Sequence, residues 1–189
     1  PRLPRALTEV LVSPPMPSAP GLLPASLSAS AYSDLRECPY RFFALRQLGL
    51  SELPELLDAP DKRDMGNWLH RVLKAFHEAR PAPRALDDDR LAIDVLAAQE
   101  ATDMGLDAAA FLPFRAAWPS MREAYLRWLH DEHEERPGRP GPRFEVAEVD
   151  REAWLGRWRI RGQLDRIDRQ PSPEGALAVV IDYKTETRS

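Results

Sequence analysis

Apolar residues recur at helical spacing between residues 61 and 79, which predicts an amphipathic helix there. Its inward face would consist of Met65, Leu69, Val72, Leu73 and Phe76. Pro81 and Pro83 would end it, because a proline disfavours helical backbone in the residue before it. A second helix is expected over 87–102, with Leu91, Val95 and Leu96 facing inward.

Two more helices are predicted before the sequence changes character. A short one covers 108–117 and is interrupted by Pro113, and a strongly amphipathic one covers 120–135. Nearer the N-terminus, Ser28 and Ser30 offer helix N-caps. Pro39 begins or kinks a segment over 40–48, and Gly49 is a plausible stop after it.

Strand patterns follow a cluster of prolines and glycines at 136–142, which is the best internal boundary in the chain. Residues 144–148 and 158–167 alternate between apolar and polar, and 176–183 form a continuous apolar run. The predicted fold class is therefore α/β in an α+β arrangement, with a helical part over 27–136 and a sheet of at least three strands over 143–189. Residues 1–26 are rich in proline and are expected to be an extended lead-in.

Composition excludes some classes of protein. Hydrophobic residues make up 43% of the 189-residue chain and charged residues 30%, as in a globular protein. No apolar run reaches the roughly 18 residues of a membrane span, so no membrane partner is expected. The single cysteine, Cys38, cannot form an internal disulfide, which favours a reducing cytoplasm. The net charge of −4 gives no sign of nucleic-acid binding by itself.

The candidate chemistry lies at the ends of the last two predicted strands. Asp182 and Lys184 follow the apolar run, and residues two apart on a strand share a face. Asp165 lies near the end of the preceding strand. Metal-dependent phosphodiester cleavage requires acids that hold a divalent cation and a positioned ammonium group beside the attacking water. An isolated Asp-x-Lys also arises by chance, so its position at a strand end carries the argument.

Each further site residue has a competing interpretation. Asp168 is the rival of Asp165, which is favoured because it lies deeper in the apolar stretch. Glu145 and Glu148 compete for a third carboxylate, and Glu148 is favoured because it shares the half-buried face of its strand. The polar strand face that carries Asp165 could also be an edge in water.

Four histidines remain to be assigned. Side chains lean toward the N-terminus of their helix, and Gly66 leaves open space one turn before His70, so His70 could face a cleft. A partly buried histidine with a backbone partner is the competing interpretation. His77 could contact a phosphate or have no role. His130 and His133 are interpreted as part of a solvated helix end and not as metal ligands.

Taken in order, these elements resemble the nuclease domain of the RecB/AddB group in the PD-(D/E)xK superfamily, and most of all the C-terminal region of AddB-type helicase–nuclease subunits. The resemblance runs from about Leu27 to the end of the chain. The matching segments are 27–32 with 38–43, 66–73, Glu148, 162–168 and 180–185.

The resemblance implies a restriction-endonuclease-like core and a metal-dependent DNA exonuclease that acts in double-strand-break repair. His70, Glu148, Asp165, Asp182 and the backbone carbonyl of Tyr183 would surround Mg²⁺ or Mn²⁺. Lys184 would orient the water, with Asp182, Asp165 and Glu148 as its catalytic partners. DNA ends would be held by their phosphates, and an AddA-like helicase–nuclease subunit would be the protein partner.

The chain departs from the family in two ways. In many relatives a cysteine that matches Cys38 joins three later cysteines to hold a [4Fe–4S] cluster, and the chain has no others. The family also places a helix after the Asp-x-Lys strand, and the chain stops at Ser189, so we expect a C-terminally truncated piece. Two alternatives stay open: an inactive DNA-end-binding or scaffolding module of the same fold, and an unrelated helical protein-interaction domain.

Overall fold

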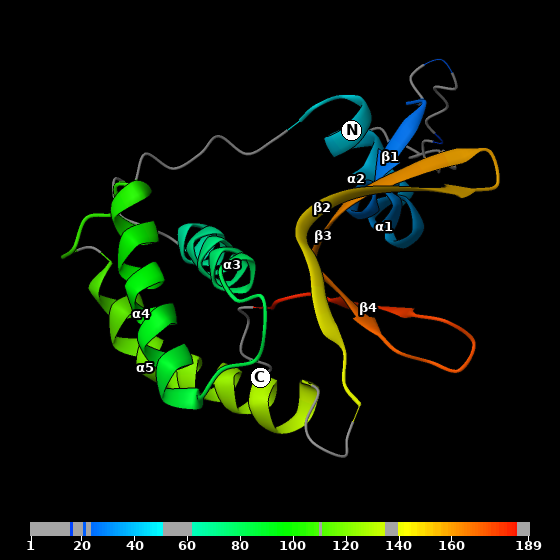
Figure 1. Ribbon diagram of the computed structural model, residues 1–189. Coiled ribbons are helices and arrows are strands. Elements are labelled where there is room, and N and C mark those ends of the chain that lie inside the picture. The colour runs from blue at the N-terminus through cyan, green and yellow to red at the C-terminus, as the bar shows by residue number, and fades with distance from the viewer. Residues whose placement is uncertain are drawn as a thin grey trace, which may run out of the picture. The chain divides into compact units, whose positions relative to one another are not determined.

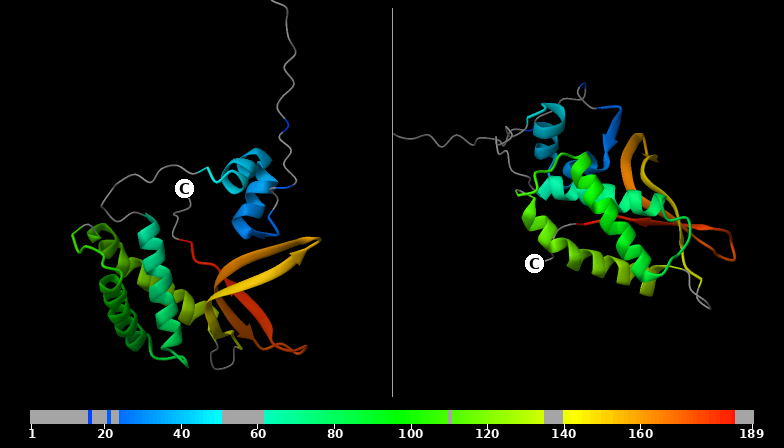
Figure 2. Two further views of the ribbon diagram at one scale, coloured as in Figure 1. Left: turned by 90° about the horizontal axis from the view of Figure 1, so that it is seen from above. Right: turned by 60° about the vertical axis from the view of Figure 1, so that its left-hand side comes forward.

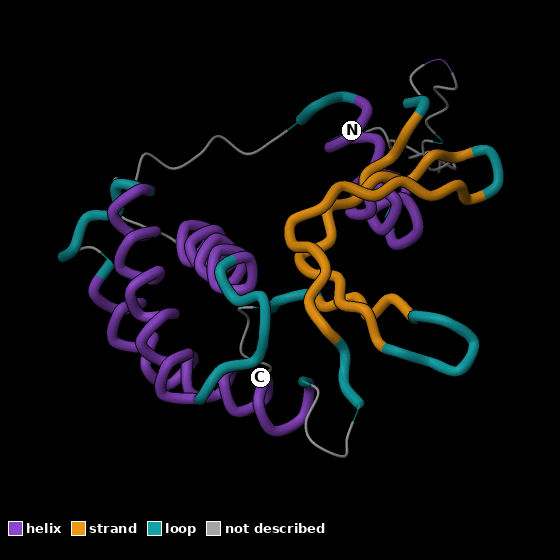
Figure 3. The backbone as a smooth tube through the Cα atoms, in the orientation of Figure 1, coloured by secondary structure: helices purple, strands orange, loops and turns teal. Residues whose placement is uncertain are grey.

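The computed structural model describes residues 16, 21, 24–50, 62–109, 111–134 and 140–184. Its elements are, in order, β1 (Ser26–Ser28), α1 (Ala29–Glu37), α2 (Pro39–Phe42), the π-helix η2 (Phe43–Gln47), α3 (Lys62–Glu78), α4 (Leu86–Asp103), α5 (Leu112–Arg127), the π-helix η3 (Trp128–His133), β2 (Arg143–Leu155), β3 (Trp158–Gln170) and β4 (Leu177–Ile181). The helices precede β2, β3 and β4, and the predicted α/β class is confirmed (Figures 1 and 3).

The strands form a four-stranded sheet in which β3 pairs with β1, β2 and β4. β2 and β3 are joined by a tight turn in which Gly156 has φ of 60°, a conformation that glycine adopts without a steric cost. β4 runs antiparallel to β3, with Arg166 opposite Ile181 and Gln170 opposite Leu177. This register brings the segment after β4 to the middle of β3.

The chain divides into two compact units, 1–52 with 154–160 and 53–153 with 161–189. In the first, the buried residues Leu27, Ala31 and Phe42 form a small core. Ser28 caps α1, its hydroxyl accepting a hydrogen bond from the Ala31 amide at 3.0 Å, as predicted. Gly49 follows η2 with φ of 67°, which confirms it as a stop.

The second unit holds the main core, built where α3 packs against α4 and α4 against α5 (Figure 2). The predicted inward face of α3 is confirmed for Leu69, Val72, Leu73 and Phe76, which are all buried, whereas Met65 is only partly buried. Trp68 lies beside them and its indole Nε1 donates to the Ala97 carbonyl oxygen at 3.0 Å. This bond fixes α3 against α4.

The predicted inward face of α4 was wrong for two of its three residues. Leu91 and Val95 are 69% and 61% exposed, whereas Leu96 is partly buried and packs against the core, as predicted. The fully buried apolar residues of α4 are Ile93 and Ala97. The alanine-rich sequence of α4 has no strong apolar face of its own, so the packing with α3 decides which side is buried.

The two predicted helices over 108–117 and 120–135 are one helix, α5, followed by η3. Pro113 does not interrupt it but lies in its first turn, where the missing amide hydrogen would have no helical partner anyway. Pro119 lies inside the helix. η3 ends with a bond from the Glu134 amide to the Leu129 carbonyl at 2.9 Å, a five-residue step.

The apolar strand β4 is shorter than predicted and is not fully buried, because Leu177 and Val180 are more than half exposed.

The lead-in over 1–26, the connector before α3 and the cluster around 136–139 lie mostly outside the described residues. Within the described ranges, every helix is too short or too polar to cross a bilayer.

Candidate metal centre

Three potential metal ligands meet in the second unit, one each from α3, β2 and β3. His70 Nδ1 lies 3.0 Å from Glu148 Oε1 and 3.6 Å from Asp165 Oδ1. One ligand atom from each residue lies within 4.8 Å of the other two. The three side chains are between 12% and 28% exposed, so they are accessible to solvent and yet held in place.

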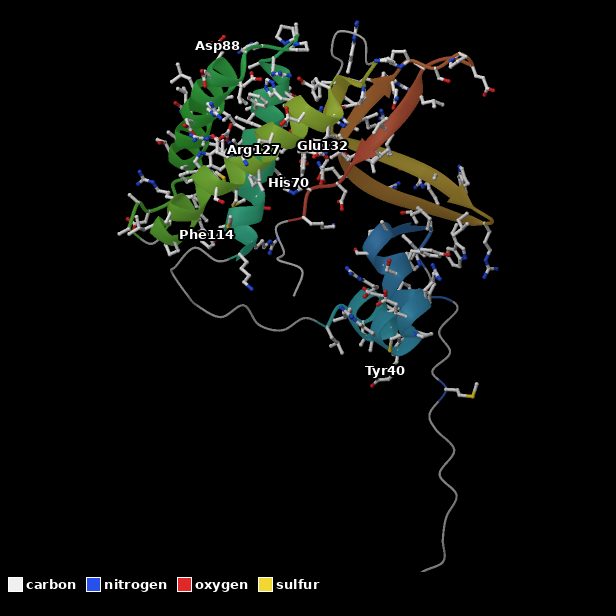
Figure 4. All side chains as sticks on the ribbon, turned by 90° about the horizontal axis from the view of Figure 1, so that it is seen from below. Tyr40, His70, Asp88, Phe114, Arg127 and Glu132 are labelled. Atoms are coloured by element: carbon white, nitrogen blue, oxygen red, sulfur yellow. The ribbon has the colours of Figure 1, made fainter. Side chains whose placement is uncertain are left out.

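His70 lies at the edge of the apolar face of α3, next to the buried Leu69 (Figure 4 labels it). The predicted open space at Gly66 is present, since an added Cβ would meet no atom within 4 Å. The Tyr183 ring packs edge-on against the imidazole, with centroids 5.9 Å apart. The helix, the aromatic contact and the hydrogen bond to Glu148 together orient the ring.

Glu148 has an unusual backbone for a strand residue, with φ of 49°. Among the described residues it is the single non-glycine residue with positive φ. Such a conformation costs on the order of 1–3 kcal/mol, and residues of this kind cluster at functional sites. Glu145, its predicted rival, is instead paired with Arg169 on the surface, with Arg169 Nε 2.6 Å from Glu145 Oε2.

Asp165 is held by the segment that follows β4. Its Oδ2 accepts a hydrogen bond from the Tyr183 backbone amide at 2.6 Å, which leaves Oδ1 directed at His70. Asp168, its predicted rival, is fully buried and faces other partners. Residue 183 is therefore tied to the ligand cluster through its main chain as well as its ring.

Asp182 and Lys184 lie on either side of Tyr183 and pair with each other, Nζ to Oδ2 at 2.8 Å. Both side chains are exposed, 59% for Asp182 and 73% for Lys184. Asp182 does not belong to the three-ligand group found in the described part of the chain. The Asp182 carboxylate instead pairs with the ammonium group of Lys184, just after the end of β4 at Ile181.

A buried network of charged and polar side chains also lies in the second unit, and its members are Arg166, Asp168, His133 and His77. Arg166, 1% exposed, donates two hydrogen bonds to Asp168, at 2.7 and 2.6 Å. His133 Nε2 bonds the same carboxylate at 2.6 Å. Burial by itself would raise the pKa of Asp168, but the hydrogen bonds from His133 and Arg166 outweigh it and hold that pKa below its usual value.

His77 belongs to the same network and is 2% exposed. Its Nε2 lies 2.6 Å from Arg166 Nη1 and also contacts the Tyr125 hydroxyl. Burial, and then the positive charge of Arg166, hold the pKa of His77 well below its ordinary value. A neutral imidazole can accept from the guanidinium, so His77 is a buried acceptor and the suggested phosphate contact was wrong.

The prediction of a solvated end for His130 and His133 was also wrong. His130 Nε2 lies 2.8 Å from Oδ2 of the fully buried Asp89, which also pairs with Arg80. His133 binds Asp168 in the same way. Both imidazoles therefore join η3 to buried acids on other elements.

Sequence reasoning missed Arg166, Tyr125 and the ring of Tyr183. One signal was available, because Arg166 and Asp168 are two apart on a strand and so share a face. Cys38 lies in the other unit and is exposed, and its Sγ caps α2 by accepting from the Arg41 amide at 3.4 Å. It is the single cysteine of the sequence.

The chemistry of the cluster fits a divalent cation. One imidazole nitrogen and two carboxylate oxygens that lie within 4.8 Å of one another can all reach an ion with bonds of about 2.0–2.4 Å. Carboxylates suit Mg²⁺ and Mn²⁺, and imidazole in the set favours the transition metal. His70, Glu148 and Asp165 therefore fit such an ion as first ligands.

Comparison with known proteins gave two findings. The model of the family described as the PD-(D/E)XK nuclease superfamily matches residues 26–189. A relative from Pelotomaculum thermopropionicum, which is one of the subunits of an ATP-dependent helicase/deoxyribonuclease, is 27% identical over 210 aligned positions, and these cover 97% of this chain. The chain spans 16% of the length of that relative.

Proposed function

Because the chain belongs to the PD-(D/E)XK nuclease superfamily, we propose that it is the metal-dependent DNA exonuclease domain of a helicase–nuclease. The observation that carries this proposal is the approach of His70, Glu148 and Asp165 from three different elements. The reaction would be hydrolysis of phosphodiester bonds at linear DNA ends during double-strand-break repair and recombination. Membership of this family excludes the unrelated helical interaction domain as an alternative.

His70, Glu148 and Asp165 would hold Mg²⁺ or Mn²⁺, and Asp182 and the Tyr183 carbonyl oxygen would complete the ligand set. When bound, the cation would supply a more acidic water and would polarise a phosphate oxygen. The Tyr183 amide keeps Asp165 oriented while the ion binds, since its hydrogen bond uses only Oδ2. The imidazole of His70 is held against rotation by Tyr183 and Glu148.

Asp182 would have to leave Lys184 in order to act as a ligand. Their ion pair is exposed, and an exposed pair of this kind contributes about 0–1 kcal/mol. That cost is small beside the attraction of a divalent cation for a carboxylate. Lys184 would orient the attacking water and stabilise charge that develops on the phosphate.

The wider setting of this domain belongs to the proposal too. DNA would be held by its phosphates, without sequence readout. An AddA-like helicase–nuclease subunit would be the partner, and the cytoplasm the compartment. A [4Fe–4S] cluster in the full-length protein would need three cysteines in addition to Cys38.

The test is degradation of linear DNA by the full-length protein in Mg²⁺ or Mn²⁺. Lys184→Ala is expected to abolish degradation without loss of folding, as judged by circular dichroism. Lys74→Ala is the matched control, because Lys74 is a half-exposed lysine whose pair is the nearby Glu78 at 4.0 Å. Equal activity in Lys184→Ala would remove this lysine from the mechanism.

A second function of the same fold is an inactive module that binds DNA ends. The observation that favours it is the exposed position of Asp182, outside the three-ligand group of the described residues. That function predicts binding of linear DNA with no release of nucleotides at any metal concentration. The same degradation assay, run beside a binding assay, distinguishes the two.

A further inference from the structure

Tyr125 of α5 packs against Tyr183, the residue that contacts two of the three candidate metal ligands. The two tyrosine rings meet edge-on with their centroids 6.1 Å apart, and their hydroxyl oxygens lie 3.4 Å apart. The Tyr183 ring also meets the His70 imidazole edge-on, with centroids 5.9 Å apart. In the segment that follows β4, this ring therefore contacts both α3 and α5 (Figure 1).

The sheet does not fix the side chain of Tyr183. β4 ends at Ile181, so Tyr183 lies beyond the last residue of the strand. Its neighbours on both sides, Asp182 and Lys184, are 59% and 73% exposed. An aromatic ring in such a segment takes its orientation from the side chains that it touches, and Tyr125 is one of them.

Tyr125 is itself firmly anchored. Its hydroxyl accepts a hydrogen bond from Arg166 Nη1 at 3.0 Å and also contacts the buried imidazole of His77. Arg166 is fixed in turn by its two hydrogen bonds to Asp168. The Tyr125 ring packs against Trp128, with centroids 5.6 Å apart. The end of Tyr125 that meets Tyr183 is therefore part of a rigid, buried network.

We propose that Tyr125 is a positioning residue of the metal centre, which fixes the Tyr183 ring and through that ring the imidazole of His70. This inference rests on the proposed function, because it needs His70 to be a metal ligand. A ligand that is already oriented binds an ion without a further loss of rotational freedom. A group that touches a ligand directly is commonly worth about 10- to 100-fold in metal affinity. Tyr125 acts through one more side chain, so its effect should be smaller.

The competing interpretation is that Tyr125 only gives Arg166 and His77 a hydrogen-bonding partner inside the protein. In that case its hydroxyl would contribute to folding stability and would not affect the ion. The edge-on contact and the approach of the two hydroxyl groups favour positioning, since both direct Tyr125 at the residue beside His70. The two interpretations differ in what happens to metal binding when the contact with Tyr183 is weakened.

The experiment is calorimetric titration of Mn²⁺ into the chain, without DNA. Tyr125→Phe keeps the ring and removes the hydroxyl, and it should weaken Mn²⁺ binding by about 3- to 10-fold, the range for loss of one hydrogen bond. Tyr40→Phe is the matched control, because it makes the same chemical change in a tyrosine that is 67% exposed and belongs to the other unit. Its Mn²⁺ affinity should equal that of the wild-type protein.

A double-mutant cycle tests whether Tyr125 acts through Tyr183. Tyr183→Phe removes the other hydroxyl of the same pair and should weaken Mn²⁺ binding by a similar factor. Because both changes break one contact, the double variant should bind Mn²⁺ no more weakly than the weaker single variant. Losses that simply add would contradict the proposed route.

Two further measurements separate positioning from stability. The ring current of Tyr183 shifts the NMR signals of the His70 imidazole protons, so these shifts report the contact in the absence of metal. They should change in Tyr125→Phe and stay the same in Tyr40→Phe. His130→Gln loses the bond to the buried Asp89 and should lower the urea midpoint. It should leave the Mn²⁺ affinity and the His70 signals unchanged wherever the protein is folded.

Unchanged Mn²⁺ affinity in Tyr125→Phe would overturn the inference. If that variant does not fold, Tyr183→Phe tests the same contact from its other side, and unchanged affinity there overturns the inference equally. Failure of the metal centre itself gives a different result, since the wild-type protein would then bind no Mn²⁺ or His70→Ala would bind it as tightly. That result would refute the proposed ligand set and the inference with it.

Discussion

The buried ion pair between Arg166 and Asp168 offers the sharpest test of the packing. Arg166→Met keeps the length of the side chain but removes both hydrogen bonds to Asp168, which is 0% exposed. It also removes the donor to His77. The Asp168 carboxylate would then keep only its hydrogen bond with His133. Breaking a buried pair from one side costs roughly 3–5 kcal/mol, since the remaining charge stays buried.

Arg169→Met is the matched control on the same strand. Arg169 also pairs with a carboxylate, that of Glu145, but the two side chains are 48% and 37% exposed. An exposed pair contributes about 0–1 kcal/mol. The two arginines thus differ in burial and hardly at all in chemistry.

The assay is urea unfolding of the chain followed by tryptophan fluorescence. With a slope of about 2 kcal/mol per molar urea, Arg166→Met should lower the midpoint by roughly 1.5–2.5 M and Arg169→Met by less than about 0.5 M. The double variant Arg166→Met with Asp168→Leu should recover part of the loss, because no uncompensated charge remains. Equal midpoints for the two single variants would refute the reasoning.

Three further outcomes are expected. Because the pKa of His77 is lowered in the folded protein, the unfolded chain binds one more proton at acidic pH, and the free energy of unfolding should fall as the pH drops below about 6.5. The fall should be at most about 1.4 kcal/mol per pH unit. Urea midpoints measured from pH 7.5 to 5 should fall less in His77→Gln than in the unchanged protein. The Glu148→Gly variant should melt at a higher temperature than Glu148→Gln, because glycine adopts φ of 49° without strain. Equal melting temperatures of the two variants would show that the backbone is not strained at residue 148. His70→Ala should weaken Mn²⁺ binding, measured by calorimetry, by about tenfold or more, and unchanged affinity would place the ion elsewhere.

Local patterns predicted those features that depend on neighbours in the sequence. The inward face of α3, the cap at Ser28 and the stop at Gly49 all follow from spacing or from the conformational preferences of one residue. Asp165, which the order of polar and apolar residues along its strand favoured over Asp168, is one of the three possible ligands that lie close together, and its role as a ligand stays a prediction.

Features set by distant partners could not be predicted in the same way. The histidines of η3 bind acids that lie 41 and 35 residues away, and nothing in the local charge pattern indicates those partners. The orientation of α4 depends on α3 in the same way. The exposed pairing of Asp182 with Lys184 depends on where β4 ends, which an apolar run does not define to within one residue.

Three side chains, two in the π-helix η3 and one at its C-cap, bind partners in three different parts of the chain. His130 reaches Asp89 on α4, His133 reaches Asp168 on β3, and Glu134 reaches Arg80 after α3. A π-helical turn holds one residue more than an α-helical turn. Deleting a single residue here would restore regular α-helix and swing the later anchors by about 100° around the axis. Homologous chains that keep these histidines should therefore tolerate no change of length in this turn, whereas their surface loops vary freely.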